Sequence, residues 1–127
     1  MMNGLLLTNN GIKMNIKRGQ IILVNLDPVI GSEQGKVRPA LIIQNDTGNQ
    51  YSPVTIIAPI TSKVFSMEYP TNVQITPKDS GLEKASTILL NQIRTIDKSR
   101  IIKTLQTLKK EQMNKVDAAI KVSLGLD

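Results

Sequence analysis

Apolar residues along the chain fall into short runs of strand length that polar turns separate, which is the pattern of a mainly β protein. Ile21–Val24 is apolar without interruption, so we expect both faces of that strand to be covered. Val73 and Ile75 alternate with polar neighbours, as in a half-buried strand. Clusters rich in Asn, Asp, Gly and Pro predict the connections, at residues 28–37, 45–49 and 77–84. The strands are predicted at residues 19–27, 38–45, 53–60, 71–76, 85–96 and 101–108.

The last segment of the chain has the period of a helix that begins near Lys109. One helical stripe of apolar residues recurs at spacings of three, four and four residues: Met113, Val116, Ile120 and Leu124. Gly125 is placed to end the helix. The stripe is expected to pack against the sheet as part of the core. The predicted fold is therefore a strongly curved antiparallel sheet, a small barrel, with one C-terminal helix.

The first 13 residues are predicted to be a leader that is disordered or a start-site artefact, because they are rich in Asn and Gly and show no periodicity. Organised sequence begins just after Met14, and residues 14–127 are predicted to form a single domain. The chain contains no transmembrane run and no signal-peptide pattern. We therefore expect a cytoplasmic protein that is not associated with a membrane.

Composition narrows the chemistry that the chain can perform. It contains no cysteine and no histidine, which excludes disulfides, thiol chemistry, a histidine base and a zinc site. We expect neither a metal nor a cofactor. The formal net charge of +6 fits a polyanionic partner such as nucleic acid. The aromatic residues are few (Tyr51, Phe65 and Tyr69), so base recognition must rely mainly on hydrogen bonds and apolar contacts.

One arginine stands where a polar loop meets an apolar strand, within the stretch Gly31–Ile43. The guanidinium of Arg38 is a planar fork of donors that stays charged and suits phosphate. The alternative is a surface hairpin in which Arg38 forms a structural ion pair, and composition alone favours this alternative.

Six short segments resemble the MazF/PemK family, the toxins of bacterial and archaeal toxin–antitoxin pairs. They follow the family's order from about Met14 to the end of the chain. The loop, the Arg-Pro start of the strand and the Gln-x-Arg-Thr-Ile-Asp segment are specific in combination, and they favour a functional Arg38. The segments are Lys17-Arg18-Gly19, Asp27-Pro28, Gly31-Ser32-Glu33-Gln34-Gly35, Val37-Arg38-Pro39, Ile60-Thr61 and Gln92-Ile93-Arg94-Thr95-Ile96-Asp97.

This resemblance implies a Src-homology-3-like barrel of the CcdB/PemK type with a C-terminal helix, assembled as a homodimer. It implies a metal-independent endoribonuclease, an mRNA interferase, which cuts single-stranded RNA at a short sequence. It also implies a cognate antitoxin whose extended tail blocks the RNA groove. Binding to DNA is expected only for the complex with the antitoxin.

The resemblance assigns catalysis to Arg38 and Thr61. The expected reaction is attack of a ribose 2′-hydroxyl on the adjacent phosphate, which leaves a 2′,3′-cyclic phosphate and a 5′-hydroxyl. We expect Arg38 to stabilise the phosphorane and Thr61 to donate a hydrogen bond to the same oxygens. Alternatively, the Thr61 hydroxyl satisfies backbone groups at a strand end. Glu33 is the candidate general base, and its alternative role is that of a solvated loop carboxylate.

The remaining candidate residues are expected to contact RNA. Asn91 stands where family members often carry an acidic residue, so proton abstraction is in doubt there and Asn91 instead reads a base edge or positions a phosphate. Arg94, close to Asp97, is expected to be structural rather than a phosphate ligand. Base edges are assigned to Ser32, Glu33, Gln34 and Gln92, and phosphates to Lys36 and Lys63.

Two other functions remain open from the sequence. A CcdB-like toxin of the same fold binds and poisons DNA gyrase without cutting RNA. The basic balance would also allow a non-catalytic RNA-binding module. The Val37-Arg38-Pro39 and Ile60-Thr61 segments favour the nuclease.

Overall fold

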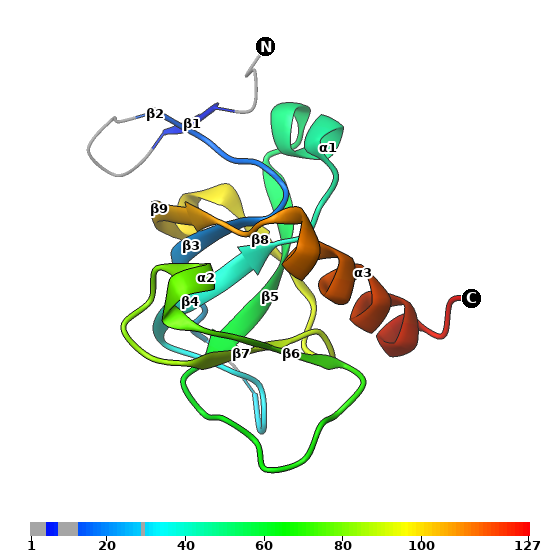
Figure 1. The fold of residues 1–127 in the computed structure, drawn as a ribbon. Coiled ribbons are helices and arrows are strands. Elements are labelled where there is room, and N and C mark those ends of the chain that lie inside the picture. The colour runs from blue at the N-terminus through cyan, green and yellow to red at the C-terminus, as the bar shows by residue number, and fades with distance from the viewer. Residues whose placement is uncertain (1–4, 8–12, 29) are drawn as a thin grey trace.

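The computed structural model describes residues 5–7, 13–28 and 30–127, and it is built on one curved antiparallel sheet with a helix against it (Figure 1). The sheet contains β3 (Gln20–Asn25), β4 (Val37–Ile42), β5 (Val54–Thr61), β6 (Asn72–Ile75), β7 (Ser86–Leu89), β8 (Arg94–Asp97) and β9 (Ile101–Thr107). The helices are α1 (Asp46–Tyr51), α2 (Pro77–Ser80) and α3 (Lys110–Leu124), with a 3-10 turn, η1, at Lys98–Arg100. None of these helices has the length and hydropathy needed to cross a lipid bilayer.

The strand order is β6-β7-β5-β4-β3-β9, and β8 pairs with β5 beside this path. β5 is shared by three partners: its first half pairs with β8, its middle with β4 and its last two residues with β7. Because β5 pairs with three strands in succession along its length, the sheet is bent, as predicted. Its pairing does not close into a ring among the described residues, so the predicted mainly β fold with a C-terminal helix is an open, curved sheet.

Both faces of the sheet are covered, as the uninterrupted apolar run of β3 predicts. Ile21 belongs to the core under α3, whereas Ile22 and Val24 belong to the core on the other face. All three side chains are fully buried. Burial of such a side chain contributes about 1.5–3 kcal/mol, so β3 holds the two layers together.

The helix α3 begins and ends where the sequence predicts. Met113 and Val116 of the predicted stripe are buried against the sheet, Ile120 is partly buried there, and Ala119 is buried beside them. Gly125, with φ of 70°, adopts the left-handed conformation that ends the helix. Leu124, however, is 59% exposed, so the predicted stripe runs one turn beyond the core.

Arg18 ties the helix to the sheet. Its Nη2 lies 2.6 Å from Asp117 Oδ1 on α3, and its Nε donates to the carbonyl of Ile43 at 2.8 Å. The family-like Lys17-Arg18-Gly19 segment therefore has a structural contact in this chain.

Two predicted connections contain helices, and one predicted strand is divided in two. The 45–49 cluster is the start of α1, whose N-cap Asn45 accepts a hydrogen bond from the Gly48 N–H at 2.7 Å. The 77–84 turn contains α2, with a capping box formed by Thr76 and Asp79. The 85–96 strand is two strands, β7 and β8, because the chain turns where the Gln92 N–H donates to the Leu89 carbonyl at 3.1 Å.

A buried polar cluster lies beneath α1. Asn49 is fully buried, and its Oδ1 accepts hydrogen bonds from Gln44 Nε2 at 3.2 Å and from Thr55 Oγ1 at 2.7 Å. The Lys98 ammonium donates to the Asn49 carbonyl. Lys98 is only 5% exposed, and burial lowers the pKa of this amine below its ordinary value.

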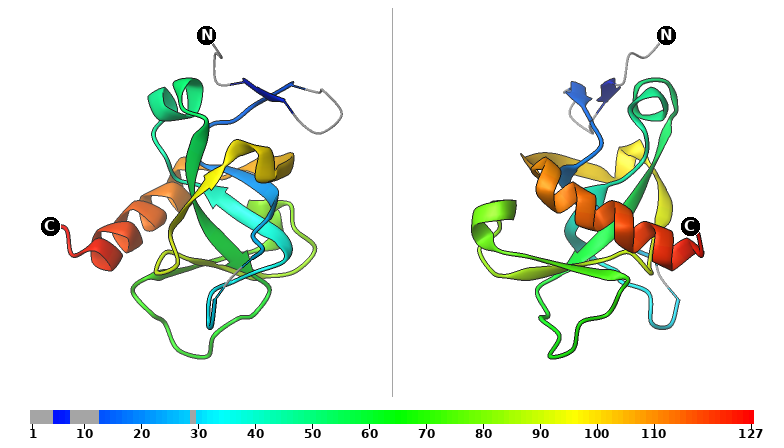
Figure 2. Two further views of the ribbon diagram at one scale, coloured as in Figure 1. Left: turned by 180° about the vertical axis from the view of Figure 1, so that it is seen from behind. Right: turned by 45° about the vertical axis from the view of Figure 1, so that its right-hand side comes forward.

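The predicted leader lies largely outside the described residues, since 1–4 and 8–12 are not among them. Of the rest, β1 (Leu5–Leu7) pairs antiparallel with β2 (Lys13–Asn15), with Leu6 opposite Met14. This hairpin is separate from the main sheet (Figure 2). The single domain from residue 14 and the origin of the leader stay predictions.

The β3–β4 loop and the β5–β6 loop leave the sheet at the same end, opposite the end that carries α1 (Figures 1 and 2). This end holds most of the predicted site residues.

Candidate active site

Hydrogen bonds within the β3–β4 loop define its shape. The Lys36 N–H donates to Asp27 Oδ1 at 2.6 Å, and the Leu26 N–H donates to the Lys36 carbonyl at 2.9 Å. Lys36 adopts φ of 64°, a left-handed conformation that is uncommon for a residue with a side chain. Glu33 Oε1 accepts a hydrogen bond from the Ile30 N–H at 2.8 Å. The loop is therefore closed both at its neck and near its tip.

A chain of hydrogen bonds brings three predicted residues together. The Gln34 N–H donates to Gln92 Oε1 at 2.9 Å, which docks the loop on the turn between β7 and β8. Gln34 Oε1 in turn accepts a hydrogen bond from Arg38 Nη1. Arg38 Nε donates to the Gly35 carbonyl at 2.7 Å. The guanidinium is thus oriented by its own loop.

Arg38 is half-buried, and both of its hydrogen-bond acceptors are neutral oxygens. Within residues 13–28 and 30–127, no carboxylate lies at ion-pair distance from its guanidinium. The alternative of a structural ion pair therefore does not describe this arginine. A positioned cation without a paired anion is what an anionic ligand requires.

Thr61 is the last residue of β5. The β4–β5 ladder ends at the pair of Ala40 with Pro59, and two residues further along β5 Thr61 pairs with Thr87 of β7. The Thr61 hydroxyl oxygen accepts a hydrogen bond from the Lys63 N–H at 3.2 Å. A hydroxyl that accepts one bond still has its own hydrogen to donate. The predicted backbone contact is therefore present and does not prevent Thr61 from donating to a ligand.

Lys63 follows Thr61 in the β5–β6 loop. Its carbonyl accepts a hydrogen bond from Thr87 Oγ1 at 2.9 Å, which fixes the backbone at this point. Its ammonium lies 4.8 Å from the centroid of the Phe65 ring, a cation–π contact. The side chain is exposed, so its charge is available to solvent and ligands.

No side-chain hydrogen bond joins the other predicted residues of the described chain to Arg38. Ser32 and Asn91 are exposed, and Glu33 is exposed with its carboxylate engaged inside the loop. Arg94 Nη1 donates to the Leu26 carbonyl at 3.0 Å, a structural contact, and it is not paired with Asp97. Asp97 instead caps η1, and hydrogen bonds from Ser99 lower its pKa below the ordinary range.

A hollow of about 420 Å³ lies beside Arg38 and is lined by several residues that the sequence analysis missed. The 77–84 segment had no recognisable motif in the sequence. It leads into β7, and the pairing of β7 with β5 places its last residues near Arg38. The missed lining residues are Ser62, Leu82, Glu83, Lys84 and Ser86.

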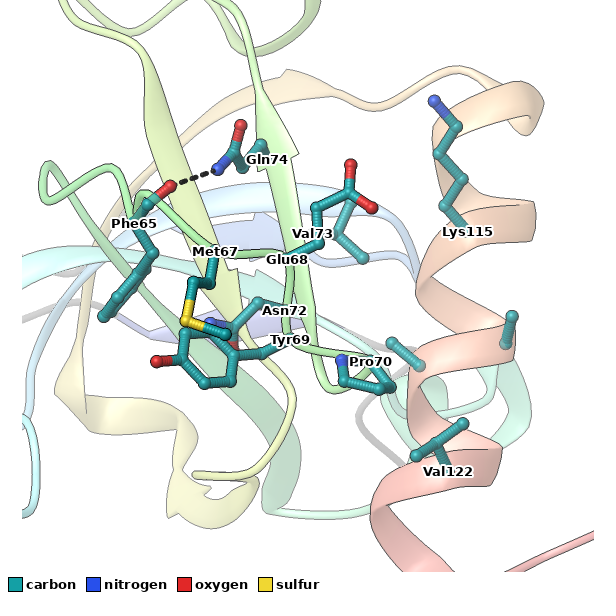
Figure 3. A pocket seen from close by; sticks show the side chains of 12 residues that line it. Phe65, Met67, Glu68, Tyr69, Pro70, Asn72, Val73, Gln74, Lys115 and Val122 are labelled. Atoms are coloured by element: carbon teal, nitrogen blue, oxygen red, sulfur yellow. Dashed lines mark hydrogen bonds between the residues drawn. The ribbon is translucent and has the colours of Figure 1, made fainter.

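A larger hollow of about 650 Å³ lies elsewhere, between the β5–β6 loop and α3. Figure 3 shows Lys115 and Val122 of α3 on one side, with Met67 and Tyr69 of the loop on the other. None of the predicted site residues lines it. The part of the chain that the structure describes also contains no group of three or more metal-ligating side chains.

Comparison with known proteins connects this geometry to a family. Over 113 residues the chain is 50% identical to Endoribonuclease EndoA of Bacillus subtilis (strain 168), and the match covers 89% of this chain and 97% of that protein. Crystal structures give the same fold. MazF of Deinococcus radiodurans matches with a TM-score of 0.74 at 25% identity, over 87% of this chain and 97% of that one. A mycobacterial endoribonuclease in complex with its cognate antitoxin matches with a TM-score of 0.69 at 23% identity, over 88% and 95%.

A family model also covers most of the chain. Residues 17–124 match the model of the PemK-like, MazF-like toxin of type II toxin–antitoxin systems. This range includes the β3–β4 loop, Arg38, Thr61 and Gln92. The chain therefore belongs to the PemK/MazF toxin family.

Proposed function

We propose that this endoribonuclease toxin cuts single-stranded RNA within a short sequence, without a metal ion, by attack of a ribose 2′-hydroxyl on the adjacent phosphate. The hydroxyl loses its proton as its oxygen bonds to phosphorus, and the P–O5′ bond breaks. The products are a 2′,3′-cyclic phosphate and a 5′-hydroxyl that takes up a proton. DNA lacks the attacking hydroxyl, so the enzyme should not cut it. The observation that carries this proposal is the Arg38 guanidinium, held by two neutral oxygens beside a hollow.

We assign Arg38 to electrostatic stabilisation of the phosphorane, because its permanent charge suits that role better than proton transfer. Thr61 donates a hydrogen bond to the same phosphoryl oxygens. Glu33 is the candidate general base, using the carboxylate oxygen that does not bind the Ile30 N–H. Asn91 is neutral, so it positions the substrate rather than taking a proton.

The two glutamines are suited to reading base edges. The Gln34 side-chain oxygen is engaged by Arg38, and the Gln92 side-chain oxygen is engaged by the Gln34 N–H. Each amide therefore turns its NH₂ group, a double donor, to the ligand. Ser32 adds a hydroxyl to this set, and Lys36 and Lys63 supply charge for phosphates.

We further propose four features that family membership and the relatives support. The toxin acts in the cytoplasm and is held inactive by a cognate antitoxin, whose tail occupies the RNA groove. It forms a homodimer with the groove between its subunits, and the toxin reaches DNA only through the antitoxin. The solved mycobacterial relative in complex with its antitoxin supports the partner. Light scattering would test the dimer, which should have twice the 14.0 kDa mass of the chain.

The decisive experiment compares Arg38→Lys with Arg100→Lys. Arg100 is a matched control, because it also donates to backbone carbonyls, those of Asn25 and Asp27, and does not line the hollow. The substrate is an RNA with a single cut site, in EDTA. We expect Arg38→Lys to lower cleavage by ~10²-fold or more, because lysine keeps the charge but loses the planar fork. Binding and melting temperature should change little.

Near-normal cleavage by Arg38→Lys, or a collapse of its melting temperature, would remove Arg38 from catalysis. If the unaltered protein inhibits gyrase and leaves RNA intact, it is a CcdB-like poison. If it binds RNA without cutting it, it is a binding module.

A further inference from the structure

The hollow beside Arg38 has a lining that matches the chemistry of a nucleotide. Its volume of about 420 Å³ lies within the ~300–1,000 Å³ typical of small-ligand sites. Pro39, Ile60 and Leu82 supply apolar surface, which suits the faces of a base. Charged and hydroxyl groups complete the lining: Arg38, Ser62, Glu83, Lys84 and Ser86. A base with its phosphate needs both kinds of surface side by side.

Hydrogen bonds hold the backbone on both sides of Glu83 and Lys84. Ser86 Oγ donates to the Lys84 carbonyl at 3.0 Å, where the segment enters β7. The Leu82 N–H donates to Ser80 Oγ at 3.0 Å, and Ser80 is fully buried. Both ends of the segment are therefore fixed.

The short helix α2 just before this segment is itself anchored to distant elements. Gln106 of β9 donates through Nε2 to the Asp79 carbonyl at 3.0 Å, and Gln112 of α3 donates through Nε2 to Asp79 Oδ1 at 3.2 Å. A backbone held in this way loses little freedom when its side chains bind a ligand.

The opposite charges of Glu83 and Lys84 suit them to different groups of a nucleotide. Arg38 and Lys84 are two cations in one site, and the proposed function places the scissile phosphate at Arg38. Lys84 is not needed for the reaction at that phosphate, but an RNA strand carries a further phosphate on either side of the scissile one, which Lys84 can bind. Glu83 repels phosphate and offers only acceptors, so its natural partner is the donor on a base edge.

We propose that this hollow is a nucleotide subsite of the RNA groove, in which Lys84 binds a phosphate adjacent to the scissile one and Glu83 accepts a hydrogen bond from the exocyclic amino group of a base. The inference rests on the proposed function and deepens it. Cytosine, adenine and guanine carry such an amino group, whereas uracil does not. Glu83 therefore disfavours uracil at one position of the recognised sequence.

The phosphate contact is tested with Lys84→Gln and, as a matched control, Lys78→Gln. Lys78 is an exposed lysine on α2 that does not line the hollow. The probe is a single-site RNA with a 2′-deoxynucleotide at the cut, which binds but is not cleaved. The log–log slope of affinity against salt should flatten by about 0.7 for Lys84→Gln and stay unchanged for Lys78→Gln. Equal slopes for the two variants would overturn the assignment.

Single methylphosphonate substitutions then locate the contact. Neutralising the phosphate that Lys84 binds should weaken the wild-type complex but not weaken the Lys84→Gln complex further. The position that shows this loss of additivity should be adjacent to the cut. If no position adjacent to the cut behaves in this way, Lys84 is not at the proposed subsite.

The base contact is tested with Glu83→Gln on RNAs that vary one nucleotide at a time around the cut. Wild type should prefer amino-bearing bases over uracil at one position by roughly fivefold or more, and Glu83→Gln should lose that preference. Unchanged preference at every position would overturn the base contact. An acidic limb lost from the pH–rate profile without any change in preference would make Glu83 a general base instead.

The proposed function and the subsite can fail separately. If the unaltered protein cuts no RNA, the proposed function fails. If it cuts RNA while Lys84→Gln and Glu83→Gln behave like Lys78→Gln, only the subsite fails.

Discussion

Gln34→Ala separates two roles that the structure allows for this residue. The substitution removes the Oε1 atom that accepts a hydrogen bond from Arg38 Nη1. It leaves the backbone N–H that docks the loop on Gln92 Oε1, and it leaves the bond from Arg38 Nε to the Gly35 carbonyl at 2.7 Å. The loop should keep its place while the guanidinium loses one of its two anchors.

The size of the effect follows from that one lost contact. A hydrogen bond to a charged group contributes about 1.5–3 kcal/mol net. Because Arg38 is only half-buried, water replaces part of this, and we take the lower end of the range. An energy of about 1.4 kcal/mol corresponds to a factor of ten, so kcat should fall about tenfold. The free energy of unfolding should fall by no more than about 1.5 kcal/mol.

The assay measures kcat and KM on a single-site RNA for Gln34→Ala, Arg38→Lys and the double variant. Gln50→Ala is the control, since Gln50 is an exposed glutamine on α1 at the opposite end of the molecule (Figure 1). If Gln34 acts by orienting Arg38, the two effects should be non-additive. A rise in KM with kcat unchanged would refute this reasoning and leave Gln34 as a base-reading residue. Full additivity would also refute it.

Two further predictions concern ionisable groups. Glu33→Gln keeps an acceptor for the Ile30 N–H, so the loop should keep its shape. If Glu33 is the base, the cleavage rate should fall by ~10²–10⁴ and the acidic limb of the pH–rate profile should disappear. Near-normal cleavage would exclude Glu33 as the base. Burial lowers the pKa of Lys98 from 10.5, so the folded state binds fewer protons than the unfolded state in the window between the lowered value and 10.5. Stability should therefore rise with pH through that window, and urea unfolding of Lys98→Met should show a weaker rise; equal pH dependence would contradict it.

The sequence predicted well those features that depend on local pattern. The apolar run Ile21–Val24 marked a strand covered on both faces, and its alternate residues do enter two different cores. The spacing of Met113 and Val116 marked the buried face of α3. Such patterns are reliable because burial is set by the period of the element itself.

Features that depend on two competing local structures were predicted less well. Asn45, Asp46 and Gly48 suit a turn, but the same side chains also cap and begin a short helix, and α1 is what forms. Groups outside the cluster favour the helix: the buried Asn49 is held by Gln44 and Thr55, five and six residues away, and by Lys98, 49 residues away. No local pattern contains that information.

The candidate site shows the same division between local and distant information. Gln34, Arg38 and Gln92 were singled out from the sequence, but the bond between Gln34 and Gln92 spans 58 residues and comes from the fold. Glu83 and Lys84 reach the hollow because β7 pairs with β5, with Ile60 opposite Ile88. A polar turn of unremarkable composition thus becomes part of a site through strand pairing.

The residues proposed for catalysis and those proposed to read bases lie on different parts of the fold. Arg38 and Thr61 stand at the ends of β4 and β5, whose neighbouring residues Ala40, Leu41 and Ala58 are fully buried and so tolerate little substitution. The residues proposed to read bases lie instead on three exposed connections: the β3–β4 loop, the β7–β8 turn and the segment after α2. Substitution there changes the contacts to bases without moving Arg38 and Thr61, the two residues proposed to carry out catalysis. The same chemistry can therefore be kept while the RNA sequence that is cut changes, one connection at a time.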